Sequence, residues 1–225
     1  MRTTIRSYHT FLPGNYIWLK VLIYLLYPII GIFGGMILCS LLPIDKEAAL
    51  AVNMVLTGCG IIVFEFLLDY FAFGGIASKD TGRLEYLKTS VKGEEILKKG
   101  LIADVVRRFL SIAVILSGEF FVTNIAFRSS EENHHGTGQL LLAILLMFVL
   151  SEIGLCITRM FELIGVDILV MQVIYVAYIF LYTMVVGRMQ GAFIPLIVVL
   201  AVLSGLVLWL HFRLVFRRVR KSYQD

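Results

Sequence analysis

The chain has 225 residues, of which 59% are hydrophobic and only 16% are charged, and its mean hydropathy is +0.89. A soluble domain covers its surface with polar groups, so this composition excludes an ordinary water-soluble fold. The formal net charge of +4 does not indicate nucleic-acid binding, because the basic residues lie at the ends of apolar runs, where retention of positive charge in the cytoplasm explains them. The composition therefore predicts an integral membrane protein.

Residues 1–16 precede the first apolar run and mix aromatic with basic side chains. Such a segment is typical of an interfacial region that lies on the membrane surface before the chain enters it. Its sequence lacks a short apolar core followed by a small-residue cleavage site, so a removable signal peptide is not expected.

Six apolar runs follow, and each is long enough to cross the roughly 30 Å hydrocarbon core of a bilayer, which takes about 20 residues of helix. They occupy residues 17–42, 48–76, 100–127, 139–160, 163–186 and 192–216. We therefore expect an all-α integral membrane protein with six transmembrane helices in a single transmembrane domain that covers residues 1–225. Little chain remains for a soluble catalytic domain.

The distribution of lysine and arginine predicts the orientation of these helices. If the N-terminus is cytoplasmic, every basic residue lies on the cytoplasmic side except Lys46, Arg128 and Arg188. By the positive-inside rule we expect both termini in the cytoplasm, with residues 217–225 as a basic cytoplasmic tail. The expected location is the plasma membrane of a bacterium, crossed several times.

The longest cytoplasmic connection, residues 77–99, lies between the second and third runs. Three of its apolar residues are spaced three and four apart, which predicts a short amphipathic helix with charged residues on its other faces. Such a helix can dock into a groove of a soluble partner, although a solvated connector fits the periodicity equally well. The candidate docking residues are Arg83, Leu84, Glu85, Leu87, Lys88 and Val91.

Two stretches of this connection carry a family resemblance. They are Thr81-Gly82-Arg83-Leu84-Glu85-Tyr86-Leu87-Lys88-Thr89-Ser90 and Glu95-Ile96-Leu97-Lys98-Lys99. Together they resemble the intracellular coupling segment of type-2 ATP-binding-cassette exporter permeases, in letters and in their position between spans two and three. The six runs and the interfacial N-terminal segment resemble that family over the whole chain.

The resemblance implies a permease that exports an amphipathic peptide or a lipid-like cargo and pairs with a second copy or a paralogue. It also implies a cytosolic ATPase subunit, whose ATP- and Mg-dependent closure reaches the spans through the coupling helix. The chain has no Gly-x-x-x-x-Gly-Lys-Ser/Thr phosphate loop, so nucleotide chemistry is expected on a separate polypeptide. We expect neither catalytic residues nor a cofactor or metal site on this chain.

Ionisable residues inside the apolar runs need a partner or a cavity, because charge is costly at that depth. Glu65 and Asp69 are four residues apart and so share one face of the second helix, and Arg107 and Arg108 near the start of the third run are their expected partners. We expect these four residues to form a buried charge cluster. A structural lock between two helices is the favoured interpretation over a substrate contact, and a relay of coupling-helix motion is a further hypothesis.

Glu119 and Glu152 have no charged neighbour within one helical turn, so each should face the protein interior, a water-filled path or a dimer seam. They are the candidate translocation-path residues. The carboxylates of Glu65, Asp69, Glu119 and Glu152 also support an alternative function, an ion-coupled secondary carrier that needs no ATPase.

Overall fold

The structure is a computed structural model that describes residues 2–12, 17–41, 46–73, 90–126, 137–161, 164–186 and 193–224. Within these ranges every regular element is helical. In chain order the elements are α1 (Arg2–Phe11), α2 (Ile17–Val21), the π-helix η1 (Leu22–Leu26), α3 (Tyr27–Leu41), α4 (Lys46–Phe73), α6 (Gly93–Ala126), α7 (Thr137–Phe161), α8 (Ile164–Leu181), the π-helix η2 (Tyr182–Val186) and α9 (Phe193–Gln224).

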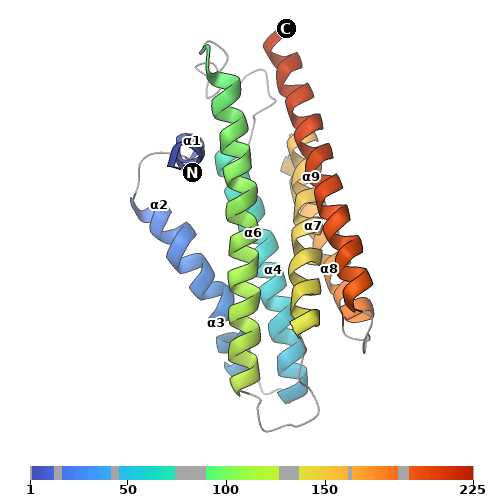
Figure 1. Cartoon of the computed structure of the whole chain (residues 1–225). Coiled ribbons are helices and arrows are strands. Elements are labelled where there is room, and N and C mark those ends of the chain that lie inside the picture. The colour runs from blue at the N-terminus through green and yellow to red at the C-terminus, as the bar shows by residue number, and fades with distance from the viewer. Residues whose placement is uncertain are drawn as a thin grey trace.

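The long helices run side by side and point alternately up and down in Figure 1. The path α2–η1–α3 leans against α6 at its lower end and diverges from it toward its upper end, while α7 packs against both α8 and α9. α1 is seen end-on, so it lies across the bundle rather than along it (Figure 1). The start of α6 and the end of α9 lie at the upper end of the bundle, here called the basic end.

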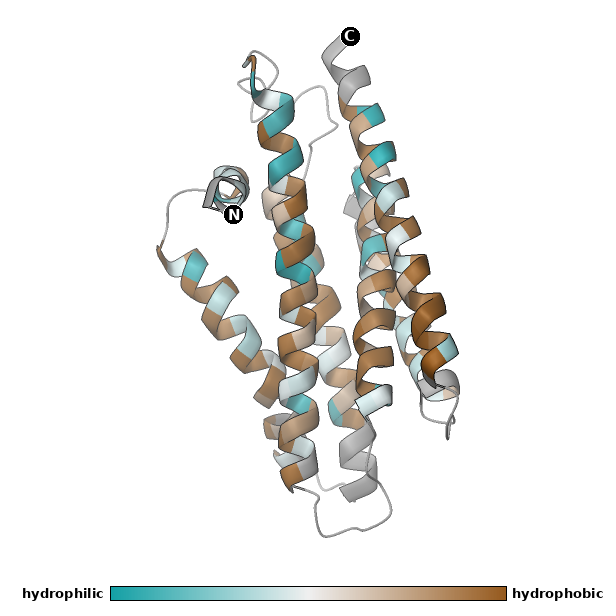
Figure 2. Cartoon of the chain, viewed as in Figure 1, coloured by the Kyte–Doolittle hydropathy of each residue, from teal (hydrophilic) through white to brown (hydrophobic). Residues whose placement is uncertain are grey.

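In the part of the chain that the structure describes, four stretches of helix are long and apolar enough to cross a membrane, namely Ile17–Ile37, Val52–Phe73, Thr137–Met160 and Ile194–Val219. They fall within or overlap the predicted runs 17–42, 48–76, 139–160 and 192–216. Brown, hydrophobic residues cover much of α7 and the lower part of α9 in Figure 2, and many large apolar side chains on α3 and α9 are exposed. This architecture is compatible with a multi-pass membrane protein.

The two remaining predicted runs correspond to helices of a different character. Ile168–Met184 is a shorter apolar stretch, and α6 carries charged residues in its first half. α6 has 34 residues and is therefore about 51 Å long, well beyond the roughly 30 Å of a hydrocarbon core. Its first turn also carries exposed Glu94 and Glu95, and Lys99 donates a hydrogen bond of 2.5 Å to Glu95. That hydrogen bond lowers the pKa of the Glu95 carboxyl.

Two apolar clusters form the core and lie one above the other along the bundle. The lower and larger cluster joins α4, α6, α7 and α8, and Ile61, Ile112, Leu142 and Met147 at its centre are almost fully buried. The upper cluster lies toward the basic end and brings α1 against α4, α6 and α9. Its buried members are Tyr8, Phe11, Leu12, Ile23, Leu68, Ala72, Phe73, Leu97, Leu101, Val215 and Val219.

A glycine on α6 permits the close approach of α1. A Cβ atom added at Gly100 would lie 2.5 Å from Cε2 of Phe11, closer than side chains approach one another. The phenyl ring of Phe11 therefore packs directly on the backbone of α6 at this point. The predicted interfacial segment 1–16 thus contains a helix that is packed onto the bundle over its last turns.

Candidate functional site

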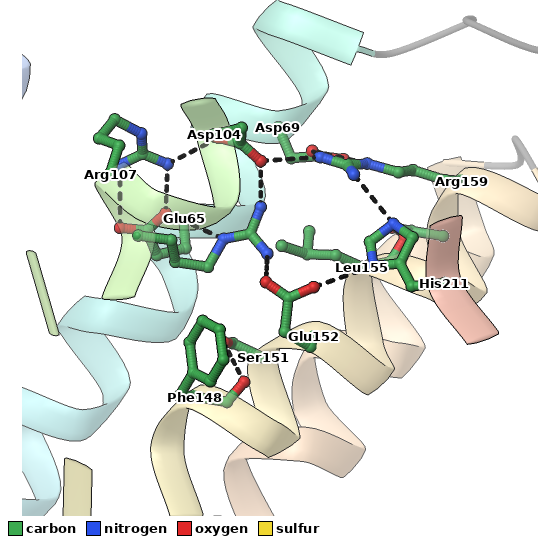
Figure 3. Close-up of polar contacts among 12 residues, drawn as sticks. Glu65, Asp69, Asp104, Arg107, Phe148, Ser151, Glu152, Leu155, Arg159 and His211 are labelled. Carbon is green, nitrogen blue, oxygen red and sulfur yellow. Dashed lines mark hydrogen bonds and ion pairs between the residues drawn. The ribbon is translucent and has the colours of Figure 1, made fainter. Parts of the chain in front are cut away.

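A set of buried ionisable side chains lies between the two apolar clusters, where α4, α6, α7 and α9 meet (Figure 3). We call it the charge network, and its members are Glu65, Asp69, Asp104, Arg107, Arg108, Glu152, Arg159 and His211. Each of them is at most 7% exposed. Charges this deep must be paired with one another, because an unpaired buried charge is strongly destabilising.

Helical spacing brings these residues to common faces. Asp104 precedes Arg107 by three residues and Arg108 by four, so the three side chains share one side of α6. Glu152 and Arg159 are seven residues apart, about two turns, and so share one side of α7.

Arg107 joins α6 to α4. Its Nη1 and Nη2 atoms donate to Oε1 and Oε2 of Glu65 at 3.2 and 2.6 Å, a bidentate arrangement. Nη2 also donates to Asp104 at 3.0 Å. Bidentate pairs between guanidinium and carboxylate groups combine charge with fixed geometry, so this contact sets the register between the two helices.

Arg108 occupies the centre of the network. It donates through Nη1 to Glu152 on α7 and through Nη2 to Asp104 on its own helix, and its Nε lies 3.5 Å from Oε2 of Glu65. One side chain therefore holds carboxylates from three helices.

Arg159 and His211 extend the network to α9. Arg159 donates through Nε to Asp69 at 2.9 Å and through Nη2 to Asp104 at 2.9 Å. Its Nη1 lies 2.9 Å from Nε2 of His211, whose Nδ1 lies 2.9 Å from Oε2 of Glu152. A guanidinium group can only donate, so Nε2 must accept, and His211 is neutral with its proton on Nδ1, from which it donates to Glu152.

The charges of the network nearly balance. Three guanidinium groups face four carboxylates, which leaves one negative charge if His211 is neutral and every carboxylate is ionised. Binding of a single proton would make the network neutral. The arrangement is thus suited to hold four helices in one register.

Aromatic rings close the network on the side of the basic end. The guanidinium carbon of Arg159 lies 4.7 Å from the centre of the Phe73 ring, and that of Arg107 lies 5.6 Å from the centre of the Tyr8 ring. Tyr8 and Phe73 contact each other, with ring centres 6.2 Å apart. Burial raises the pKa of the Tyr8 hydroxyl well above its usual range, so this group stays protonated. α1 therefore forms part of a lid over the network.

Glu119 lies apart from the network, about three turns further along α6. Its Oε1 accepts a hydrogen bond of 2.8 Å from Nδ2 of Asn53 on α4, and among the described residues it forms no ion pair. A cavity of about 20 Å³, lined among others by Met54 and Tyr178, adjoins it. That volume has room for about one water molecule.

The structure places the predicted site residues in different surroundings. Glu65 contacts both arginines, whereas Asp69 pairs with Arg159, which the sequence analysis had not assigned to the cluster. Glu152 faces the protein interior, the first of the three expected surroundings, and pairs there with Arg108 of the network. Val91 lies fully exposed in the turn before α6. The predicted docking residues Arg83, Leu84, Glu85, Leu87 and Lys88 lie outside the described residues.

Three members of the network were missed. For Asp104 and Arg159 a signal existed, since each lies one or two helical turns from a charged residue that was already singled out, on the same face. His211 is the lone ionisable residue between the apolar start and the basic end of α9 in the sequence, and no spacing rule connects it to α7. Its contact follows from how α9 packs on α7.

Over the described residues, the fold and the network define an all-helical protein with four helices of membrane-crossing length and a buried layer of charge that joins four helices. No protein-family model, curated protein or solved structure matches the chain.

Proposed function

We propose that the chain is the membrane-spanning subunit of an exporter driven by a separate cytosolic ATPase, with six spans and both termini in the cytoplasm. The proposal rests first on the resemblance of residues 81–99 to the coupling segment of type-2 ATP-binding-cassette permeases. α6 begins at Gly93, inside that segment, with exposed charged turns that extend beyond the length of a membrane span. α1 lies across the bundle beside these turns, as an interfacial helix would.

The observation that carries the proposal is the position of Arg108. It lies on the helix that follows the coupling segment, and it binds carboxylates on α4, α6 and α7. Separating a buried ion pair leaves an uncompensated charge, at a cost of about 3–5 kcal/mol. A displacement of α6 at the basic end would therefore carry α4 and α7 with it as one body.

Alternating access can follow from such coupling. Closure of the ATPase would push on residues 77–99, and the joined helices would rock as a rigid unit and open the opposite end of the bundle. ATP and Mg would bind on the partner ATPase, and a second permease copy or a paralogue would complete the path. An amphipathic peptide or a lipid-like cargo suits the apolar and aromatic walls.

The test is a pull-down of the tagged full-length chain from its native membrane, with ATP hydrolysis measured on the purified material. We expect a stoichiometric ATPase with a phosphate loop to co-purify. The double variant Leu84→Asp/Leu87→Asp should lose this ATPase while it still inserts into membranes, because it removes the apolar stripe. Ser90→Asp is the matched control, since it adds a negative charge to an exposed position in the same segment. A chain that purifies without an ATPase, or a double variant that retains it, contradicts the proposal.

A second candidate function is an ion-coupled carrier, and Glu119 is the observation that favours it. A buried carboxyl group that contacts an amide and a water-sized cavity is a suitable site for a transported proton. In proteoliposomes without an ATPase, this candidate predicts proton uptake that Glu119→Gln abolishes. The exporter proposal predicts no proton uptake under the same conditions.

A further inference from the structure

A lateral groove opens between α1, the path α2–η1–α3 and α6. It encloses a cavity of about 430 Å³, which lies in the range of roughly 300–1,000 Å³ that is usual for sites of small organic ligands. Figure 1 shows how it arises, since α2–η1–α3 leans away from α6 toward the basic end and α1 lies across the space between them. The groove is separate from the charge network, although Arg107 contributes to both.

The walls of the groove are apolar along α6. Ile102, Val106, Leu110 and Val114 recur every four residues and therefore form one stripe, and each of them is between 39% and 54% exposed. Ile23 and Pro28 face this stripe from the other side. From Val106 to Val114 the stripe runs about 12 Å along the helix, most of the roughly 15 Å that one leaflet of a 30 Å hydrocarbon core spans.

Two residues that line the groove at the level of α1 carry a buried donor just behind its surface. The hydroxyl of Tyr8 and the Nε of Arg107 are both buried, and neither has a hydrogen-bond partner within the described part of the chain. Tyr8 is 1% exposed and Arg107 is 7% exposed. A buried donor without an acceptor is costly, and Nε of arginine can only donate, so these atoms call for an acceptor that the described residues do not supply.

The chemistry of the two donors limits the ligand. Glu65 and Asp104 already balance the charge of Arg107, so the site requires an acceptor oxygen rather than a strongly anionic group. An extended peptide would bring its own backbone N–H donors, which need acceptors. Besides its apolar walls and the two buried donors, the described lining of this groove offers the hydroxyls of Thr4, Tyr24 and Ser111 but no carboxylate or amide oxygen of a side chain. A molecule with a long apolar chain and an oxygen-rich head fits both the apolar walls and the donors.

We infer that the groove binds one acyl chain of a bilayer phospholipid, with an ester or phosphate oxygen of that lipid accepting hydrogen bonds from Tyr8 Oη and Arg107 Nε. The inference requires only that the chain lies in a membrane, and it is independent of what the protein transports. A phospholipid is favoured over a free fatty acid because the groove opens sideways beside an interfacial helix, where the ester and phosphate groups of lipids lie.

The experiment is native mass spectrometry of the full-length protein in mild detergent. After delipidation, phosphatidylethanolamine, phosphatidylglycerol or palmitate is added back at equal concentration. We expect one retained phospholipid per chain. Phosphatidylethanolamine and phosphatidylglycerol should bind with equal affinity, because the site has no net positive charge that would favour the anionic headgroup. Palmitate should bind more weakly.

Two variants test the site by different routes. Tyr8→Phe removes one hydroxyl without changing shape and should weaken retention about fivefold, the loss of roughly one hydrogen bond. Val106→Trp fills the groove from an exposed position and should abolish retention. The controls are Tyr70→Phe on α4 and Val202→Trp on α9, which are exposed and do not line the groove and should retain the lipid as the unchanged chain does.

Size-exclusion profiles identify any variant that fails to fold, and the isosteric Tyr8→Phe keeps the test decisive if Val106→Trp is unstable. The inference is overturned if no phospholipid is retained or if all four variants retain it equally. Preferential binding of palmitate, or a retained peptide in place of a lipid, would also overturn it.

Discussion

Arg108 and Glu152 face each other across the contact between α6 and α7, and both side chains are almost completely inaccessible to solvent. Arg108 also holds Asp104 on its own helix, and Glu152 also accepts from His211 on α9. This single contact therefore lies at the junction of the α6 and α9 halves of the charge network. Its removal should affect both halves.

Arg108→Met should lower the free energy of unfolding by about 3–5 kcal/mol, because it leaves buried carboxylates without their cation. Thermal unfolding of the detergent-solubilised protein measures the change. Arg213→Met is the matched control, since Arg213 is exposed and stacks on Trp209 at 5.0 Å, and it should cost less than about 1 kcal/mol. Adding Glu152→Leu to Arg108→Met should recover part of the loss, because the unpaired carboxylate is then gone. Equal stability of the two single variants would contradict the central role of Arg108.

The all-helical class of the fold could be predicted from the sequence, because long apolar runs indicate that lipid surrounds the chain, and a chain in lipid forms helices to satisfy its backbone hydrogen bonds. Long apolar runs gave the helices that cover Ile17–Ile37, Val52–Phe73, Thr137–Met160 and Ile194–Val219. Six spans and the cytoplasmic termini stay predictions. α6 begins before its predicted apolar run and α9 ends after its own, since a helix continues as long as its backbone hydrogen bonds do and need not stop where its apolar residues stop.

Helical spacing identifies some members of the charge network, but it does not identify the contacts between distant helices. Glu65, Arg107 and Arg108 were recognised because charge inside an apolar run demands a partner. The pairing of Asp69 with Arg159 depends on how α4 and α7 pack, and the sequence offers no rule for that contact between residues 90 positions apart. The contacts of His211 with Arg159 and Glu152 depend in the same way on how α9 packs against α7.

The hydrogen bonds of His211 predict its tautomer. Because Arg159 donates to Nε2, we expect a neutral imidazole with the proton on Nδ1 at pH 7. Nitrogen NMR of protein labelled at histidine, with His211→Gln to assign the signal, distinguishes the two ring nitrogens. A signal from protonated Nε2 would show that Arg159 does not donate to this ring.

The packing of α1 on α6 depends on the absence of a side chain at Gly100. Gly100→Leu should push Phe11 away, with an overpacking cost of about 1–3 kcal/mol, and expose α1. Limited trypsin digestion should then cleave after Arg6 about tenfold faster, which corresponds to about 1.4 kcal/mol of local opening. Gly205→Leu is the control, because an added Cβ there meets nothing within 4 Å. Unchanged cleavage in Gly100→Leu would mean that α1 does not depend on this contact.

Cysteine labelling can test the proposed orientation directly. In a variant whose three native cysteines are replaced by alanine, single substitutions Thr10→Cys, Thr137→Cys and Arg217→Cys place a thiol at exposed positions on α1, at the start of α7 and near the end of α9. α7 begins at the end of the bundle opposite the basic end in Figure 1. The positive-inside rule therefore predicts that a membrane-impermeant maleimide labels Thr137→Cys in intact cells and labels the other two only after permeabilisation. Labelling of all three from the same side would contradict the six-span arrangement. If Thr10→Cys and Arg217→Cys were labelled in intact cells and Thr137→Cys only after permeabilisation, the spans would stand but the orientation would be the opposite one.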